Sequence, residues 1–292
     1  MNTAILTENH MEEKCYHIHI SPQKSCFDLK LNEIRQYKDL IFLFTKQTFT
    51  VSYKQTILGP LWLFLNPLLS SIIYTLVFGT IAGLSTDGVP KLLFYLVGNA
   101  FWEYFSSCLT NNQSVFIGHA NLFGKVYFPR LVIPLSNVLS NTIKLGIQLL
   151  LVSGFLIYYC IAGAVTPNLA ALPLLIPAVF QLGLLGMGCG IIASGLTTKY
   201  RDLTVLISFG VRLWMYATPV IYPMSQIPDG LLKKLVLLNP VTQPMEQLRF
   251  AILGVGTVNL DYSILSWAIT IALAIAGIMI FNRVERTFID TV

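Results

Sequence analysis

Long apolar segments, each near the length of a membrane-spanning helix, constrain this chain more than any other sequence feature. A helix rises about 1.5 Å per residue, so about 20 apolar residues cross the ~30 Å hydrocarbon core of a bilayer. Charged residues make up only 11% of the 292 residues, against ~25% in soluble domains. The sequence predicts an all-α integral membrane protein whose transmembrane domain, 57–285, holds six spans at 57–84, 92–117, 131–160, 169–197, 203–223 and 260–282.

Basic residues outside these segments set the expected orientation. They gather before the first span, in the second and fourth loops and after the last span, whereas the first and third loops hold little charge. Because cytoplasmic loops are enriched in lysine and arginine, both termini are expected in the cytoplasm. Lys233, Lys234 and Arg249 oppose this assignment, since they fall in the outer 224–259 segment, but the other loops outvote them.

The regions outside the spans are interpreted from their polarity. Residues 1–30 are polar and unpatterned, which is typical of a flexible terminus, and 286–292 would form a cytoplasmic tail. Residues 31–56 comprise a charged amphipathic helix at 31–49 and a linker. Apolar side chains such as Phe44 repeat on one face of that helix. We expect it to lie along the cytoplasmic interface with this face in the acyl chains; the alternative is a soluble helix packed on a partner.

The 224–259 segment is broken by prolines but keeps two apolar pieces. Leu231–Leu238 and Met245–Leu253 are each too short to cross a bilayer. We expect two short re-entrant helices that dip into the outer leaflet, with Asp229 capping the first and Pro244 near the start of the second.

Small residues crowd the fourth span, where Gly186 and Gly190 form a GxxxG pattern. Small side chains let two helix backbones approach closely in lipid, so this stripe predicts a packing surface. The pattern leaves open whether the surface packs within the subunit or against a second copy.

Three ionisable residues fall at membrane depth, where charges are costly and usually functional: Glu103, Lys144 and Arg212. Lys144 lies on a polar face of the third span, and Glu103 on a matching face of the second. These antiparallel faces are expected to meet, with Glu103 pairing with Lys144 and with Arg212 as the rival partner. They could act as polar glue between helices or could contact a substrate. Their other members are Asn137, Asn141 and Gln148 on the third span, and Ser107, Thr110 or Asn111, and Ser114 on the second.

Signatures of enzymes and metal sites are missing from the sequence. It holds no HExxH motif, no CxxC pair and no paired carboxylates at an interface. The stretch 118–126 superficially resembles a P-loop, but it has one residue too many between its glycines and a valine where serine or threonine is needed. We therefore expect no catalytic residue, metal or bound cofactor, and no ATPase site in this chain.

Five short motifs follow one another along the chain: YKQTILGPLWLFLNP at 53–67, KVYFPRLVIP at 125–134, KYRDL at 199–203, TPVIYP at 218–223, and LNP at 238–240 together with Arg249. Each is modest by itself, but their order and spacing resemble the permease subunits of polysaccharide-exporting ABC transporters of the O-antigen type. The resemblance extends over residues 30–285, nearly the whole chain.

The resemblance implies a channel-forming subunit, multi-pass in the bacterial inner membrane, that exports an undecaprenyl-linked polysaccharide such as the O-antigen of lipopolysaccharide. A homodimer of permeases would associate with two copies of a separate ATPase subunit, which binds ATP and Mg; nucleic acid is not a partner. The first and fifth spans would line the channel with aromatic rings, on which sugar faces pack. The candidates are Trp62, Phe64, Tyr74, Phe78, Phe209, Trp214, Tyr216 and Tyr222.

Coupling to the ATPase is expected at the cytoplasmic face. The loop 118–130 would supply a short docking helix, and Arg201 and Asp202 would fix the turn before the fifth span. The expected contacts in the loop are Phe123, Lys125, Tyr127, Phe128 and Arg130.

Three alternatives stay open at this point. A capsular polysaccharide or teichoic-acid permease would share the motifs and carry a different glycan. A proton-coupled secondary transporter would use Glu103 and Lys144 as a relay and need no ATPase. An integral-membrane glycosyltransferase would need acidic catalytic residues at an interface, and none are apparent.

Overall fold

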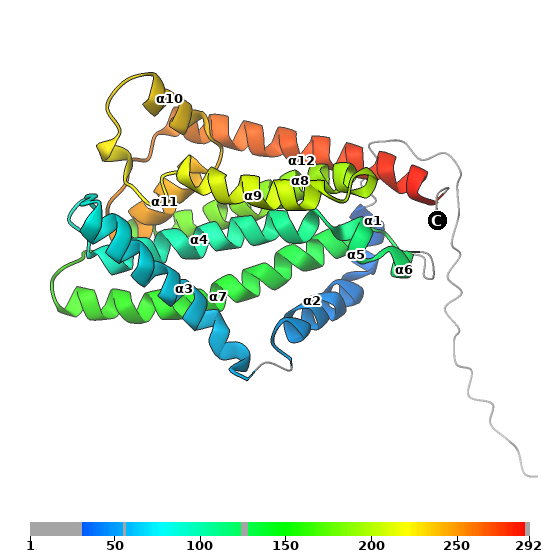
Figure 1. Ribbon diagram of the computed structural model, residues 1–292, viewed down its shortest axis with the longest axis horizontal. Coiled ribbons are helices and arrows are strands. Elements are labelled where there is room, and N and C mark those ends of the chain that lie inside the picture. The colour runs from blue at the N-terminus through cyan, green and yellow to red at the C-terminus, as the bar shows by residue number, and fades with distance from the viewer. Residues whose placement is uncertain (1–30, 55–56, 124–127, 290–292) are drawn as a thin grey trace, which may run out of the picture.

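The computed structural model describes residues 31–54, 57–123 and 128–289, and within these ranges the chain is built of helices and loops without a strand (Figure 1). The helical elements are α1 (Leu31–Gln36), α2 (Lys38–Tyr53), η1 (Gly59–Leu61), α3 (Trp62–Tyr74), η2 (Thr75–Ile81), α4 (Lys91–Asn112), α5 (Val115–Gly118), α6 (Ala120–Phe123), α7 (Val132–Ile161), η3 (Leu169–Leu174), α8 (Leu175–Lys199), α9 (Leu203–Tyr216), η4 (Met224–Gln226), α10 (Leu231–Leu238), α11 (Thr242–Leu253) and α12 (Leu260–Ile289). The region 1–30, expected to be flexible, lies outside the described residues.

Four helical stretches are long and apolar enough to cross a membrane: Gly59–Ile81, Val132–Ile161, Leu169–Lys199 and Leu260–Val284. They coincide with the first, third, fourth and sixth predicted spans. The other two predicted spans correspond to α4, which is too polar to meet the same standard, and α9, which at 14 residues is too short. The described residues thus form an all-α bundle with four apolar spans.

The polarity of α4 follows from its central position. It packs against α3, α7, α8 and α11, and most side chains from Leu93 to Phe105 are buried. A helix surrounded by other helices meets side chains instead of lipid, so hydrogen-bonding residues are tolerated where neighbours supply partners. The polar side chains of α4 therefore fit its place between other helices.

The small residues of α8 allow it to lie directly against two neighbours. A Cβ on Gly190 would lie 2.5 Å from the backbone oxygen of Leu109 in α4, and one on Gly186 would lie 2.8 Å from that of Phe105. On another side of α8, Gly188 lies against the backbone of α12. The predicted packing surface is confirmed, and these contacts are within the chain.

The first span is not a regular α-helix. It begins with the 3-10 turn η1, continues through Pro67 in α3 and widens into the π-helix η2. The hydroxyls of Ser71 and Thr75 donate to carbonyls one turn back, and Lys91 Nζ donates to the carbonyl of Gly79 in η2. Short π-helical stretches are frequent at functional sites, so this span is a candidate for part of the functional site.

The face of α2 that was expected to enter the acyl chains packs on the rest of the chain instead. Ile41 and Phe44 join the apolar cluster at the N-terminal end of α7, where the rings of Phe44 and Phe128 lie 5.8 Å apart. Other α2 side chains, Phe42 and Leu43, are 63% and 59% exposed. Protein contacts therefore anchor this helix, and a different side of it is free to meet lipid.

Two short helices occur in the 224–259 segment, as expected, but their environments differ. Most leucines of α10 are exposed, whereas α11 begins at Thr242 and is buried against α4, α8 and η3. Asp229 does not cap α10. Its carboxylate accepts a hydrogen bond from Lys233 at 2.7 Å, and this bond holds the pKa of Asp229 below its usual range.

Candidate functional site

Polar side chains of α4 and α7 face one another along the centre of the bundle. Asn111 Nδ2 donates to Asn141 Oδ1 at 3.3 Å, and Gln148 Nε2 donates to Glu103 Oε2 at 3.0 Å. These contacts lie about two turns apart along each helix. The predicted meeting of the two polar faces is confirmed.

The Glu103 carboxylate accepts a hydrogen bond from Gln148 and interacts electrostatically with the Lys144 ammonium, its predicted partner. The two helices are antiparallel. Moving toward the N-terminus of α4 from Asn111 to Glu103 therefore corresponds to moving toward the C-terminus of α7 from Asn141 to Gln148. Lys144 lies about one turn nearer the N-terminus of α7. It therefore interacts with Glu103 through its charge, while Gln148 supplies a hydrogen bond that the prediction did not name.

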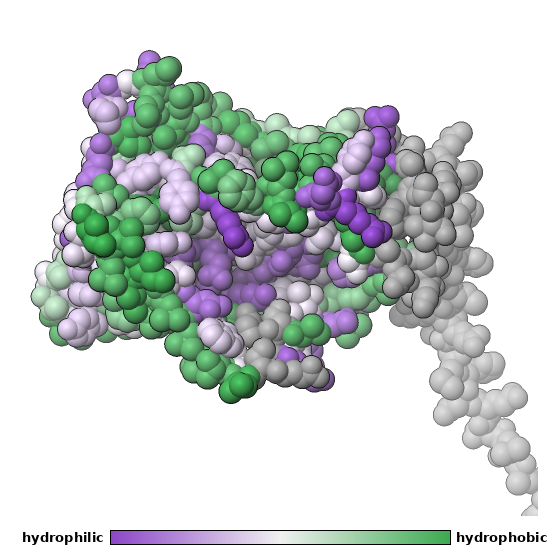
Figure 2. All heavy atoms as spheres, in the orientation of Figure 1, coloured by the Kyte–Doolittle hydropathy of each residue, from purple (hydrophilic) through white to green (hydrophobic). Residues whose placement is uncertain are grey.

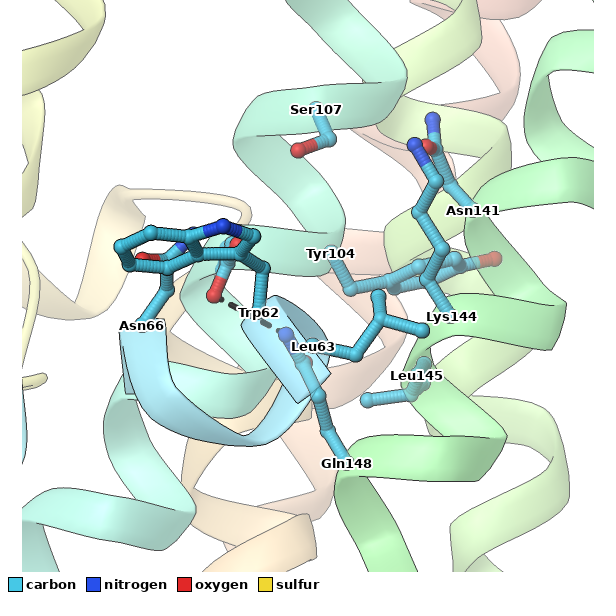
Figure 3. A pocket seen from close by; sticks show the side chains of 10 residues that line it. Trp62, Leu63, Asn66, Tyr104, Ser107, Asn141, Lys144, Leu145 and Gln148 are labelled. Carbon is cyan, nitrogen blue, oxygen red and sulfur yellow. Dashed lines mark hydrogen bonds between the residues drawn. The ribbon is translucent and has the colours of Figure 1, made fainter. Parts of the chain in front are cut away.

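Glu103 and Lys144 do line the same polar cavity, of about 80 Å³, between α3, α4 and α7. Figure 3 shows Trp62 and Asn66 on one side of it and the Lys144 side chain extending toward Asn141 on the other. A polar cavity of this size is large enough to hold water. An acid and a base that line one polar cavity each raise the free energy of the protein less than a lone charge in lipid would.

One face of the molecule is hollowed between α3 and α9, with hydrophilic side chains in the hollow and hydrophobic ones on its flanks (Figure 2). The two helices meet near their C-terminal ends, where the Tyr74 hydroxyl lies 3.9 Å from Met215 Sδ. Behind them lie α4 and α7 (Figure 1). A polar surface is thus open at the depth of the spans.

Three of the eight aromatic side chains expected in a channel are open at the surface. Trp62 on α3 is 37% exposed, and Phe209 and Tyr216 on α9 are 57% and 55% exposed. Their rings can therefore meet a molecule that enters from outside the chain.

The other aromatic candidates make contacts inside the chain or are half-buried. The rings of Tyr74 and Phe78 lie 6.0 Å apart, and Trp214 packs edge-on against a phenylalanine of α4 at 5.3 Å. The Tyr222 hydroxyl donates to a backbone carbonyl of α9 at 3.2 Å, and Phe64 is half-buried. These contacts help to hold α3, η2 and α9 in place within the chain.

Arg212 is exposed on α9 and does not line the cavity that holds Glu103. A guanidinium that faces acyl chains is strongly unfavourable. This side of α9 must therefore face water or protein.

Asn239 holds the C-terminal end of α9, a role that its sequence pattern did not reveal. Its Oδ1 accepts a hydrogen bond from Trp214 Nε1 at 3.2 Å, and its Nδ2 donates to Thr218 Oγ1 at 2.9 Å. The LNP motif thus binds the start of the TPVIYP motif. The joint occurrence of the two motifs was the signal that could have paired them.

Arg249 binds the backbone of the TPVIYP motif. Its Nη2 donates to the carbonyl of Val220 at 2.6 Å, its Nη1 lies 3.3 Å from Glu246 Oε1, and its guanidinium lies 4.1 Å from the ring centre of Phe94. The arginine that opposed the predicted orientation is therefore neutralised inside the protein and does not belong to an outer loop.

Three of the expected ATPase contacts are buried. Phe123, Phe128 and Arg130 are 9%, 5% and 8% exposed, and the Arg130 guanidinium lies 5.0 Å from the ring centre of Phe123. Lys125 and Tyr127 lie outside the described residues. The aromatic side chains of the loop cover the inner ends of α7, α8 and α12, which leaves the three buried side chains little surface for a direct contact.

Arg201 and Asp202 are exposed. Their backbone carbonyls accept hydrogen bonds from the first amides of α9, at 3.2 Å for Arg201 and 3.0 Å for Asp202, but Asp202 makes no side-chain cap. Backbone bonds, and not the two side chains, therefore hold the turn. Both side chains remain available to a partner.

Apolar spans, a charged cavity at their depth and an open polar hollow define the class of protein as a transporter. The chain belongs to the family of ABC-2 type transporters, which matches residues 39–253. It is 31% identical over 256 residues to the "O-antigen export system permease protein RfbA" of Klebsiella pneumoniae, covering 86% of this chain and 94% of that protein. A protein of the same name from Myxococcus xanthus is 31% identical over 220 residues, or 74% of this chain and 80% of that one.

Proposed function

We propose that this chain is the channel-forming permease subunit of an ATP-driven exporter of lipid-linked O-antigen across the bacterial inner membrane. The observation that carries the proposal is the hydrophilic hollow between α3 and α9 on the side of a membrane bundle. Polar and charged side chains that face acyl chains are strongly unfavourable. A second copy placed over the hollow would enclose a polar passage, so the working unit is a homodimer.

The partner subunits follow from the family. An ABC-2 permease needs a separate ATPase, and two copies of it would dock at the inner ends of the two permeases, where they bind ATP and Mg. The names of the relatives support O-antigen as the cargo. We propose undecaprenyl as its lipid carrier, since the passage would have to receive a long glycan already anchored in the inner leaflet.

In this arrangement α4, and α9 together with residues 217–223 that follow it, cross the membrane with the four apolar spans, which gives six spans and places both termini in the cytoplasm. With 22 residues, α4 is long enough to cross. The α10–α11 section closes the outer side as a re-entrant segment, with the exposed leucines of α10 in the outer leaflet.

The walls and floor of the hollow suit a moving glycan. Trp62, Phe209 and Tyr216 offer ring faces, on which the apolar faces of sugars pack without strong hydrogen bonds that would hold them. Glu103 and Lys144 offer hydrogen-bonding groups behind them. A chain of sugars would slide along the rings while its hydroxyl groups exchange partners with water and the floor.

Glycan analysis of a cell that lacks the protein tests the substrate. We expect O-antigen to disappear from the cell surface and lipid-linked O-antigen to accumulate inside, with both effects reversed when the chain is restored. If capsular polysaccharide or teichoic acid disappears and O-antigen does not, that glycan is the substrate. If the surface glycans are unchanged, the chain is not an exporter of any of them.

Replacing both Arg201 and Asp202 with alanine is expected to lower the coupled ATPase activity of the assembled complex about tenfold, as for the loss of one strong interface contact. The chain should stay as stable as the wild type, because neither side chain holds the turn. Phe123→Ala, which removes a buried side chain, should act through stability instead. It should lower the free energy of unfolding by about 3–5 kcal/mol and reduce the amount of complex. Normal coupling in the double variant would place docking elsewhere.

A further inference from the structure

Gln113, directly after α4, connects three segments that meet near the inner end of the bundle. Its carbonyl accepts a hydrogen bond from Thr197 Oγ1 of α8 at 2.6 Å, and its Nε2 donates to Ser208 Oγ of α9 at 2.9 Å. The residue is 3% exposed, and the cytoplasmic loop that carries α5 and α6 begins directly after it. One buried residue thus joins this loop to the helices on both sides of the turn before α9.

The neighbouring bonds fix the orientation of the Gln113 amide. The Ser208 hydroxyl donates its single proton to the carbonyl of Thr204 at 2.7 Å, so toward Gln113 it can only accept. The amide must therefore present its nitrogen to α9. Its Oε1 is buried and has no partner among the described residues, so the contact with Ser208 is what positions this side chain.

The Gln113–Ser208 contact matters because of how α9 is attached to the bundle. The outer end is held through Trp214 and Asn239, and Val211 and Met215 are its buried side chains. Its inner half exposes Val205 and Leu206. The Gln113–Ser208 bond lies in that inner half, beside the packing of Ile207 on the core, and is a direct polar link from this half of the helix to the end of α4.

We propose that Gln113 is a positioning residue that transmits displacement of the cytoplasmic loop to the inner half of α9. Because the loop is continuous with Gln113, a pull on the loop moves the end of α4, and the bond to Ser208 carries the movement to a helix that flanks the hollow. The width of the passage then follows the position of the docked ATPase. The inference rests on the proposed function and adds to it the route from the motor to the passage.

The test is glycan export per ATP hydrolysed, measured on the complete complex in proteoliposomes. Gln113→Leu and Ser208→Ala should each lower this ratio about three- to tenfold, the range expected for one buried hydrogen bond. The double variant should be no worse than either single one, because both remove the same contact. Ser208→Thr keeps the acceptor oxygen and should retain the wild-type ratio, which distinguishes positioning from general packing.

Gln181→Leu is the matched control. Gln181 of α8 also donates from Nε2 to a serine, Ser266 of α12, at 2.7 Å, and its Oε1 also lacks a described partner, but its hydrogen bonds among the described residues run to α12 and not to α9. Its export per ATP should equal that of the wild type. An equal loss in Gln181→Leu, or no loss in Gln113→Leu and Ser208→Ala, would overturn the inference while wild-type export upholds the proposed function. A wild-type complex that exports no glycan would remove the proposed function, and the inference with it.

Discussion

Arg249→Leu is expected to lower the free energy of unfolding by about 3–5 kcal/mol, because it leaves a buried carboxylate without its counter-charge. The side chains of Arg249 and Glu246 are each 2% exposed. The change also frees the carbonyls of Val220 and Tyr222, to which the guanidinium donates at 2.6 and 3.4 Å. Unsatisfied acceptors at this depth add to the loss.

Thermal unfolding of the purified chain in lipid nanodiscs measures this effect. The exposed ion pair between Asp229 and Lys233 provides the control, and Lys233→Ala should leave the unfolding curve unchanged. The double change of Glu246 and Arg249 to leucine should recover part of the loss, because no unpaired charge remains. A stable Arg249→Leu variant would mean that the outer end of α9 is held by other groups.

Gly190→Leu should prevent the folded chain from accumulating in the membrane. Even a Cβ at this position would lie 2.5 Å from the backbone oxygen of Leu109 and 2.7 Å from the Cβ of Asn112, both in α4. Backbone cannot yield as a flexible side chain does, so α4 and α8 would have to separate. Gly190→Ala should cost about 1–3 kcal/mol for overpacking.

Gly154 of α7 offers the control for that experiment. A Cβ there meets nothing within 4 Å, so Gly154→Leu should accumulate at the wild-type level. Quantifying both variants in membrane fractions gives the comparison. If Gly190→Leu accumulates normally, α8 does not lie against α4 as closely as these distances state.

The sequence sufficed wherever a pattern depends on a single helix. Hydropathy located the apolar spans, and helical spacing located the polar faces of α4 and α7 that meet at Asn111 and Asn141. The GxxxG stripe indicated close packing, although its partner, α4, could be identified only from three-dimensional contacts.

What the sequence could not supply was the relative placement of elements. The hydrogen-bond donor to Glu103 depends on the register between two helices, and the helical spacing alone did not name Gln148 beside Lys144. The aromatic loop residues suit either a docking surface or a local core, and only the fold shows that Phe123 and Phe128 are buried. Arg249 reads as an outer-loop cation until its carboxylate partner, three residues away, is seen to be buried with it.

ATP-driven movement of lipid-linked O-antigen into sealed vesicles tests most directly whether two copies of this chain form a passage opened by a separate ATPase. With permease and ATPase both present, glycan should become protected inside inverted vesicles only when ATP and Mg are supplied outside, and a proton gradient alone should move none. Transport driven by the gradient without the ATPase would contradict the proposal and favour a proton-coupled mechanism through Glu103 and Lys144.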